Sequence, residues 1–383
     1  MTRHKVAFTA INNWRIQFFW FRHLVKMPSL IIGILLLICL FSPFSPIKAQ
    51  PYYFRHYQVE DGLSNNTVFC SELDRHGFLW LGTKDGLDCF NGYNFKEYRS
   101  GDSAKDLKDS YIRSLYLDTS GVRDLLYIGT RIGVFKFDPL KESFDFILKT
   151  AGEVDGITED NYGRLWVITN KKLLCLNLRT YKILPVPVVQ NLEATAICKT
   201  PGGQIWVATA TGGLHQLHYD LETNHFTLEH YEVFRAGHHL SAKWIERIYS
   251  MKDGRILIGT ANFGAKLFDP ETRSVKDLLT YNSENNGIFA RDFKEVGDSV
   301  IWIASESGIY IYNLHTGSYQ NLSQKTGDSY SLSDNAVYSL TVDREGVYGR
   351  EPIREDLTTM RTLIAIFKNI IVVKVGKVPF LVM

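Results

Sequence analysis

The chain has little of what marks several large classes of protein. It contains 11 prolines in 383 residues and 13% aromatic residues, which argues against disorder and for a protein rich in β-sheet. The formal charge of +2 is nearly neutral and no block of like charge stands out. Nothing therefore favours nucleic acid or an acidic membrane surface as a partner of this chain.

Cysteine is also scarce: there are five, and none forms a C-x-x-C pair. Cys39 lies in an apolar N-terminal run, and Cys70, Cys175 and Cys198 lie in apolar runs typical of strands. We interpret these cysteines as small buried hydrophobic residues. A disulfide such as Cys70–Cys89 is the alternative if the protein is exported, and sequence alone cannot assign it.

Motifs of catalysis are absent as well. The sequence has no Gly-x-Ser-x-Gly elbow, no phosphate loop and no dinucleotide fingerprint, and no spacing selects a carboxylate pair. His215 and His218, at positions i and i+3 of an expected strand, point to opposite sides, which is poor geometry for one metal ion. We therefore predict a protein that is not an enzyme and that uses no metal and no cofactor.

The N-terminal segment resembles an export signal. Its apolar run, Leu30–Leu40, is shorter than the roughly 20 residues of a membrane span, and basic residues precede it. Ala49 supplies a small residue for cleavage before Gln50. We expect residues 1–50 to be a signal peptide, with an uncleaved inner-membrane signal anchor as the alternative. Either interpretation places residues 51 onward in the periplasm. We expect only the N-terminal segment to contact the membrane.

A repeated phrase organises the rest of the chain. It consists of a turn with Asp or Gly, then Gly-x-x-Trp, a small residue and Thr, another Gly, and an aromatic residue followed by Asp or Asn. The intervals between copies, 39 to 51 residues, match four-stranded propeller blades, and the short β-rich runs between turns are typical of strands. The tryptophan position of the phrase is occupied in turn by Trp80, Tyr127, Trp166, Trp206, Leu257 and Trp302.

These features predict an all-β protein, a β-propeller of four-stranded blades with six recognisable blades and the start of a seventh. The tryptophan would bury its large face against the neighbouring blade, and a glycine or alanine beside the threonine would leave room for that packing. The residues that we assign to this structural role are Trp80, Trp166, Trp206, Trp302, Gly82, Gly129 and Gly259.

Both ends of the repeat bear on how the ring closes. Phe54–Tyr57 matches the outermost-strand pattern Phe95–Tyr98, so residues 52–59 are expected to close the ring by joining the last blade. The seventh unit begins at Leu332, but Gly349 stands where tryptophan is expected. We predict a propeller over 51–346 and a non-propeller tail over 347–383.

For that tail, our hypothesis is a lost reading frame or a truncated gene product, in which case another frame of the gene continues the blade pattern. A genuine apolar tail is the alternative. A membrane-spanning helix is disfavoured by Lys368, Lys374 and Lys377.

Three phrases, Asp61–Val68, Gly77–Leu87 and Asn91–Phe95, resemble the two-component regulator propeller family. The resemblance implies the periplasmic sensor region of a hybrid histidine kinase, whose full-length members carry two seven-bladed propellers, an immunoglobulin-like module, a membrane helix, a kinase core, a receiver and an AraC-type DNA-binding domain. It also implies ligands that are breakdown products of complex carbohydrates, and a homodimer for the full-length relative. This chain has no kinase histidine box, ATP-binding glycine boxes, receiver aspartate or helix-turn-helix, so kinase or DNA-binding activity would belong to a longer protein.

The candidate ligand face follows from blade geometry. The turns between the second and third strands share one face with the loops that join successive blades, and loops on a rigid scaffold usually carry recognition. We expect Arg131, Asn170, Asn262 and Phe263 to bind a small-molecule or oligosaccharide ligand, with ordinary solvated turn residues as the alternative. The function we favour is a periplasmic ligand sensor. An exported propeller enzyme acting on polysaccharide and a protein-interaction scaffold are the alternatives.

Overall fold

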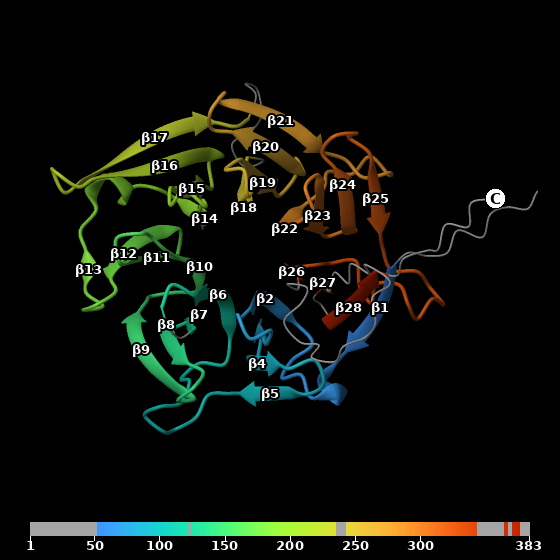
Figure 1. The fold of residues 1–383 in the computed structure, drawn as a ribbon, viewed down its shortest axis with the longest axis horizontal. Coiled ribbons are helices and arrows are strands. Elements are labelled where there is room, and N and C mark those ends of the chain that lie inside the picture. Colours follow the sequence, from blue (N-terminus) through green and yellow to red (C-terminus); the bar gives the residue numbers. More distant parts are fainter. Residues whose placement is uncertain (1–51, 122–123, 235–242, 343–363, 367–369, 376–383) are drawn as a thin grey trace, which may run out of the picture. The chain divides into compact units, whose positions relative to one another are not determined.

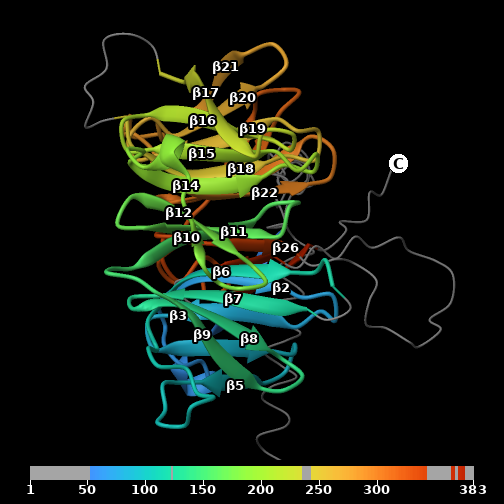
Figure 2. The same cartoon turned by 90° about the vertical axis from the view of Figure 1, so that its left-hand side faces the viewer.

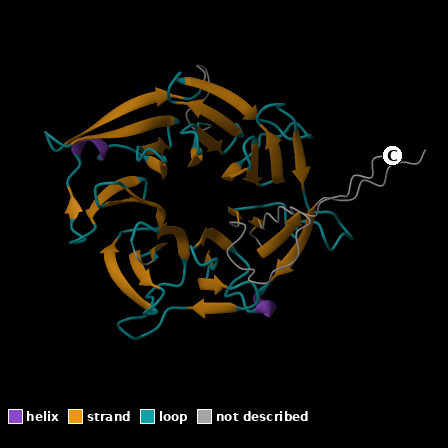
Figure 3. Ribbon diagram, viewed as in Figure 1, coloured by secondary structure: helices purple, strands orange, loops and turns teal. Residues whose placement is uncertain are grey.

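A computed structural model describes residues 52–121, 124–234, 243–342, 364–366 and 370–375. Its strands form seven antiparallel sheets of four strands each. The sheets surround a central axis as the blades of a β-propeller (Figure 1), and strands and loops make up nearly all of the ring (Figure 3). The predicted fold class is confirmed. The signal-peptide prediction for 1–50 lies outside the described residues.

Each blade runs from an innermost strand A to an outermost strand D, and we number the blades in chain order. Blades 1 to 3 are, in the order A to D, β2 (Val68–Leu73), β3 (Leu79–Thr83), β4 (Gly86–Phe90), β5 (Phe95–Tyr98); β6 (Ile112–Asp118), β7 (Leu125–Thr130), β8 (Gly133–Asp138), β9 (Ser143–Lys149); and β10 (Val154–Glu159), β11 (Arg164–Thr169), β12 (Lys172–Asn177), β13 (Ile183–Leu184). Blades 4 to 6 are β14 (Ala194–Lys199), β15 (Ile205–Thr209), β16 (Gly213–Asp220), β17 (His225–Glu232); β18 (Ile245–Ser250), β19 (Ile256–Thr260), β20 (Ala265–Asp269), β21 (Ser274–Leu279); and β22 (Ala290–Val296), β23 (Val300–Ser305), β24 (Gly308–Asn313), β25 (Tyr319–Leu322).

The seventh sheet has the order β1-β28-β27-β26, with β1 at Tyr52–Tyr57, β26 at Leu340–Val342, β27 at Ile364–Ile366 and β28 at Ile370–Val375. Two short 3-10 turns, Val59–Asp61 and Pro187–Val189, complete the described elements. The predicted closure by an N-terminal strand is confirmed, because β1 pairs antiparallel with β28. Phe54 joins the core of this junction with Trp302 and Leu340.

The tail differs from our expectation in one respect. We expected 347–383 to lie outside the propeller, yet β27 and β28 fall within it and pair with β26 and β1. These short runs are rich in isoleucine and valine, which favour strands even without the blade phrase. The hypothesis of a lost reading frame stays a prediction.

Two faces of the ring are defined by their turns. We call the face that carries the B–C turns and the loops between blades the upper face, and the face that carries the A–B and C–D turns the lower face. Figure 2 shows the ring edge-on, with the blades stacked side by side. Every residue of the B strands β3, β11, β15 and β19 is buried, because neighbouring blades cover both sides of these strands.

The repeated tryptophans are buried as predicted, and two of them carry a contact that the sequence did not suggest. The indole nitrogens of Trp80 and Trp166 each donate a hydrogen bond of 3.0 Å, to the carboxylates of Asp74 and Asp160 respectively. The same carboxylates accept backbone N–H groups of the A–B turn. One aspartate therefore fixes the turn and the buried ring together.

The glycines of the phrase allow adjacent blades to approach. A Cβ atom on Gly82 would lie 2.6 Å from the Ile112 side chain of the next blade, and one on Gly129 would lie 2.7 Å from that of Val154. A Cβ on Gly259 would lie 2.5 Å from the backbone oxygen of Ala290. These distances are far below van der Waals contact, so each glycine sets the spacing between two blades.

The four cysteines of the described residues are unpaired thiols. Cys70, Cys89, Cys175 and Cys198 are free, so the Cys70–Cys89 disulfide is not formed. Burial raises the pKa of each of these thiols to about 12. They act as small packing residues, as expected. No helix within the described residues is long and apolar enough to cross a membrane.

A Gly82→Ala substitution tests the spacing between blades. The added methyl group would collide with Cys70 Sγ, 2.5 Å away, as well as with Ile112. We expect a loss of about 1–3 kcal/mol in the free energy of unfolding, measured by chemical denaturation. Gly156→Ala is the matched control, because its nearest contact, with Ile197 Cγ2, would be 3.3 Å. Equal losses in the two variants would contradict the assigned role of Gly82.

Asp88 provides a pH test of the same fold. It is fully buried and accepts hydrogen bonds from the backbone nitrogen and hydroxyl of Ser64, in the segment that joins β1 to β2. Burial raises the pKa of Asp88 to about 7 from its usual 3.8. Between about pH 4 and pH 7 the folded protein holds a proton that the unfolded chain releases, so stability should fall as the pH rises through this window.

We expect Asp88→Asn to remove a pH-dependent change on the order of 3 kcal/mol, measured as unfolding free energy from pH 4 to pH 8. Part of the slope should remain, because burial also raises the pKa of Glu159 to about 7. Asp85→Asn, at an exposed position of the adjacent turn, is the control. A profile for Asp88→Asn that superimposes on the wild-type profile would show that the Asp88 carboxylate is not the group responsible.

Candidate functional site

A β-bulge interrupts the start of strand A in each of blades 1 to 6. In each case the pairing with strand B skips the second residue, as between Val68 and Cys70 in blade 1 and between Ile112 and Ser114 in blade 2. A bulge leaves one residue out of the ladder and redirects its side chain. The residues skipped in this way are Phe69, Arg113, Asp155, Thr195, Glu246 and Arg291.

All six bulge residues line one cavity of about 330 Å³, and Tyr338 of blade 7 joins them. Strand A begins at the upper face, so this axial cavity lies at the upper mouth of the ring, where the inner ends of the seven blades meet (Figure 1). Its remaining wall is formed by Asn170, Lys171, Ala194, Trp244 and Arg247. Every blade therefore contributes a side chain to one site.

The wall of the axial cavity combines charges with aromatic rings. The Arg113 and Asp155 side chains pair at 3.6 Å, and the Trp244 indole nitrogen donates to Glu246 Oε2 at 2.9 Å. The Arg291 guanidinium lies over the rings of Phe289 and Tyr338, at 4.4 Å and 4.3 Å from their centroids, and pairs with Glu306. Four basic and two acidic side chains line this wall, and two of the basic ones, Arg247 and Arg291, pair with carboxylates outside the lining, Asp292 and Glu306.

Two polar atoms on this wall are buried without a hydrogen-bond partner in the described structure: Arg291 Nε and Thr195 Oγ1. Leaving a buried donor unsatisfied costs about 1–3 kcal/mol, so a water or a ligand is expected to complete such groups. Lys171 makes no ion pair within the described residues, and its ammonium group lies 5.0 Å from the centroid of the Trp244 ring.

Asp292 anchors one side of the axial cavity from below. It pairs with Arg247 of blade 5 at 3.3 Å and accepts the backbone N–H of Leu340 in blade 7 at 2.9 Å. A single buried carboxylate in blade 6 therefore links three successive blades beside the axis and holds Arg247 in the cavity wall.

The structure brings one of the four predicted ligand residues, Asn170, into the axial cavity. The Arg131 guanidinium is held by Asp109 at 2.7 Å, outside the cavity wall. Phe263 packs partly buried against the core of blades 4 and 5, with its ring 5.8 Å from that of Phe234, and Asn262 precedes it in the same turn. The four residues share the upper face, and their role in binding stays a prediction.

The sequence analysis did not identify the bulge residues as candidate ligand residues, because they belong to no recognisable motif. A signal nevertheless exists: when the blades are aligned on strand A, the second position varies among Phe, Arg, Asp, Thr, Glu and Tyr while both neighbours stay small or apolar in most blades. Variation at one position of an otherwise regular repeat is what a shared binding surface would produce.

Comparison with known proteins supports the repeat assignment. Residues 62–85 match the family model described as two component regulator propeller. The chain carries a two component regulator propeller repeat. The resemblance inferred from the repeated phrases is therefore confirmed, and we refer to the described ring as the regulator propeller.

Two proteins that resemble this chain are named as parts of signalling systems. Histidine kinase P4 of Formosa agariphila is 45% identical over 56 residues, which are 14% of this chain and 4% of that protein. The extracellular domain of a hybrid two component system from B. thetaiotaomicron has a TM-score of 0.65 at 23% identity, over 85% of this chain and 42% of that chain. This chain thus spans less than half of either protein.

The same architecture also occurs in an enzyme. Virginiamycin B lyase from Staphylococcus aureus has a TM-score of 0.61 at 10% identity, over 84% of this chain and 98% of that chain. At this identity the likeness concerns the fold alone. The site of the regulator propeller must therefore be assessed from its own residues.

We predict that Asp292→Ala lowers the free energy of unfolding by about 1–3 kcal/mol, because the Leu340 N–H would be left buried without an acceptor. Chemical denaturation measures the loss. Asp145→Ala is the control: Asp145 also pairs with a basic side chain, that of Lys136, but is 61% exposed, and it should change stability by less than about 1 kcal/mol. Similar losses in both variants would argue against the anchoring role of Asp292.

Proposed function

We propose that the regulator propeller is the periplasmic ligand-sensing part of a two-component system, without enzymatic activity, and that its ligand binds in the axial cavity. The observation that carries this proposal is the convergence of one side chain from each of seven blades on that cavity. A ligand seated there would contact the whole ring at once. Signalling would require a histidine kinase.

The chemistry of the wall favours a carbohydrate breakdown product as the ligand. Arginine, lysine and amide groups can bind hydroxyl or carboxylate oxygens, while Trp244, Phe69 and Tyr338 offer aromatic surface to the C–H face of a sugar ring. The volume of about 330 Å³ lies at the lower end of the range of small-ligand pockets. The unsatisfied atoms of Arg291 and Thr195 lie on this wall, as expected of a surface that is completed by a ligand.

A catalytic role is less well supported by the same wall. Its two acidic side chains are already engaged, Asp155 with Arg113 and Glu246 with Trp244. Within the described residues no cluster of three or more histidine, cysteine or acidic side chains could hold a metal ion. The resemblance to lyases concerns the ring, so turnover of a saccharide by the purified chain is the result that would favour the enzyme alternative.

The binding proposal can be tested with Trp244→Ala. A panel of mono- to tetrasaccharides is first screened for thermal stabilisation of the wild-type chain, and each hit is then titrated by calorimetry. Because Trp244 contributes aromatic surface to the axial cavity, we expect its loss to weaken binding about tenfold or more.

Arg131→Ala is the matched control, since Arg131 lies on the same face but outside the cavity wall. Its affinity should stay within about twofold of wild type. If Arg131→Ala weakens binding while Trp244→Ala does not, the ligand binds on the outer turns of the upper face, and the axial cavity is not the site.

A further inference from the structure

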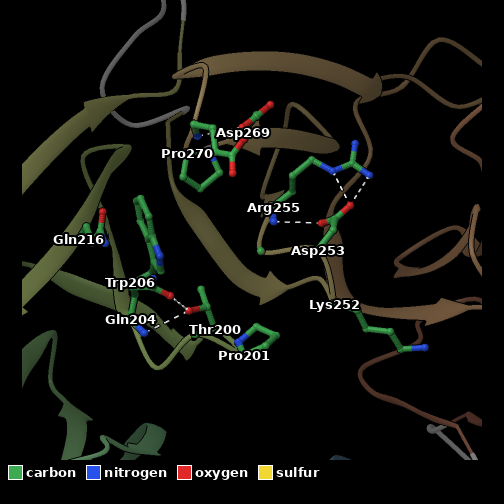
Figure 4. A pocket seen from close by; sticks show the side chains of 13 residues that line it. Thr200, Pro201, Gln204, Trp206, Gln216, Lys252, Asp253, Arg255, Asp269 and Pro270 are labelled. Atoms are coloured by element: carbon green, nitrogen blue, oxygen red, sulfur yellow. Dashed lines mark hydrogen bonds and ion pairs between the residues drawn. The ribbon is translucent and has the colours of Figure 1, made fainter.

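A second cavity, of about 460 Å³, opens on the lower face between blades 4 and 5. One wall is the A–B turn of blade 4 with strands β15 and β16, and the other is formed by the A–B and C–D turns of blade 5 (Figure 4). We call it the inter-blade pocket. It lies on the face opposite the axial cavity and shares no residue with it.

Two equivalent clefts, between blades 1 and 2 and between blades 3 and 4, are filled by side chains. Between blades 1 and 2, Arg75 reaches across to Asp124 and donates to the backbone oxygens of Thr119 and Gly121. Between blades 3 and 4, the rings of Tyr162 and Tyr219 meet at 4.9 Å, and the buried Arg164 guanidinium lies 3.8 Å from the Tyr219 ring centroid. The cleft between blades 4 and 5 has neither closure, because Pro201 stands where Arg75 stands in blade 1.

A second replacement removes the carboxylate that would accept the indole N–H of a tryptophan lining this pocket. The Trp206 side chain is 99% buried and lines the pocket, but Thr200 occupies the position at which Asp74 and Asp160 accept the indole N–H in blades 1 and 3. The Thr200 hydroxyl is bonded to Gln204 instead. Within the described part of the chain, Trp206 Nε1 donates no hydrogen bond.

Figure 4 shows Trp206, Gln204 and Thr200 on one side of the pocket and Asp253, Arg255 and Pro270 on the other. Gln216 pairs with Trp206 across the sheet and also lines the pocket, and its amide makes no hydrogen bond to a described residue. The Asp253 carboxylate is bound by Arg255, and Asp269 accepts the N–H groups of the C–D turn. The blade 4 wall therefore offers unused donors and an acceptor, and the blade 5 wall offers carboxylate oxygens.

The composition of the pocket narrows the class of ligand. Three carboxylates against two cations disfavour an anion. A flat aromatic ligand lacks a stacking surface, because Tyr231 and Phe268 already pack against the Trp206 ring at 5.3 Å and 5.6 Å. Neutral hydroxyl groups, which both donate and accept, match opposing donors and carboxylates.

From these observations we infer that the inter-blade pocket binds a neutral saccharide unit, with a hydroxyl oxygen accepting the Trp206 indole N–H. The volume of about 460 Å³ is within the range of small-ligand pockets. This site is separate from the axial cavity, so either one can bind a ligand without the other.

The test follows the indole N–H resonances of the chain labelled with ¹⁵N-tryptophan. Trp206 and Trp244 are assigned with their Trp→Phe variants, and glucose, galactose, xylose and cellobiose are added separately. We expect at least one of these sugars to shift the Trp206 resonance saturably at millimolar concentration. Absence of a saturable Trp206 shift with all four sugars would overturn the inference.

Thr200→Asp provides the decisive variant, because it restores the carboxylate found in blades 1 and 3. The new carboxylate should accept the Trp206 N–H and weaken sugar binding about tenfold or more. Thr316→Asp, which places the same charge on an exposed turn of blade 6, should bind as wild type. An unchanged sugar-induced shift in Thr200→Asp would overturn the inference.

Two further readouts keep the outcomes distinct. Should Thr200→Asp fail to fold, Gln216→Leu removes the neighbouring amide without adding charge, and it must also weaken the Trp206 response. Trp244 reports on the axial cavity. A shift of Trp244 without one of Trp206 supports the proposed sensor site and overturns the inter-blade pocket, whereas the reverse pattern supports the pocket and counts against the axial site.

Discussion

The close approach of strand A to strand B of the preceding blade is the constraint on which the ring depends. Gly82, Gly129 and Gly259 leave no room for a Cβ atom at this contact. Blade 3 reverses the two residue sizes. Ile168 of strand B stands where blades 1, 2 and 5 have glycine, and it pairs with Gly156 of strand A. Tight packing of this kind fixes the radius of the inner ring, and the radius decides which side chains can meet at the axis.

The axial cavity is a consequence of the same geometry. The bulge at the start of strand A takes one residue per blade out of the hydrogen-bond ladder at the point where the blades are closest together. Those residues need not pack against a neighbouring sheet, so they are free to vary in chemistry. The ring thus separates its structural positions, which repeat, from its recognition positions, which differ from blade to blade.

The sequence predicted the fold better than the site, for a physical reason. Trp80, Gly82 and their equivalents are repeated because each blade solves the same packing problem, so the period alone reveals them. Phe69 and Arg291 come to line the same cavity only when the ring closes, and no local sequence pattern indicates this. Asn170 was the one predicted ligand residue that lines the axial cavity, because its turn on the upper face borders that cavity. Arg131 instead pairs with Asp109, a contact that the sequence did not indicate.

The pairing of β1 with β28 has a consequence for how the chain folds. The seventh sheet joins strands from opposite ends of the described chain, Tyr52–Tyr57 and Ile370–Val375. The first six blades can form in order as the chain emerges, but β1 must wait for its partner until β28 follows. Ring completion is therefore a late, non-local step, and until it occurs blade 6 presents an uncovered face on which misassembly can begin.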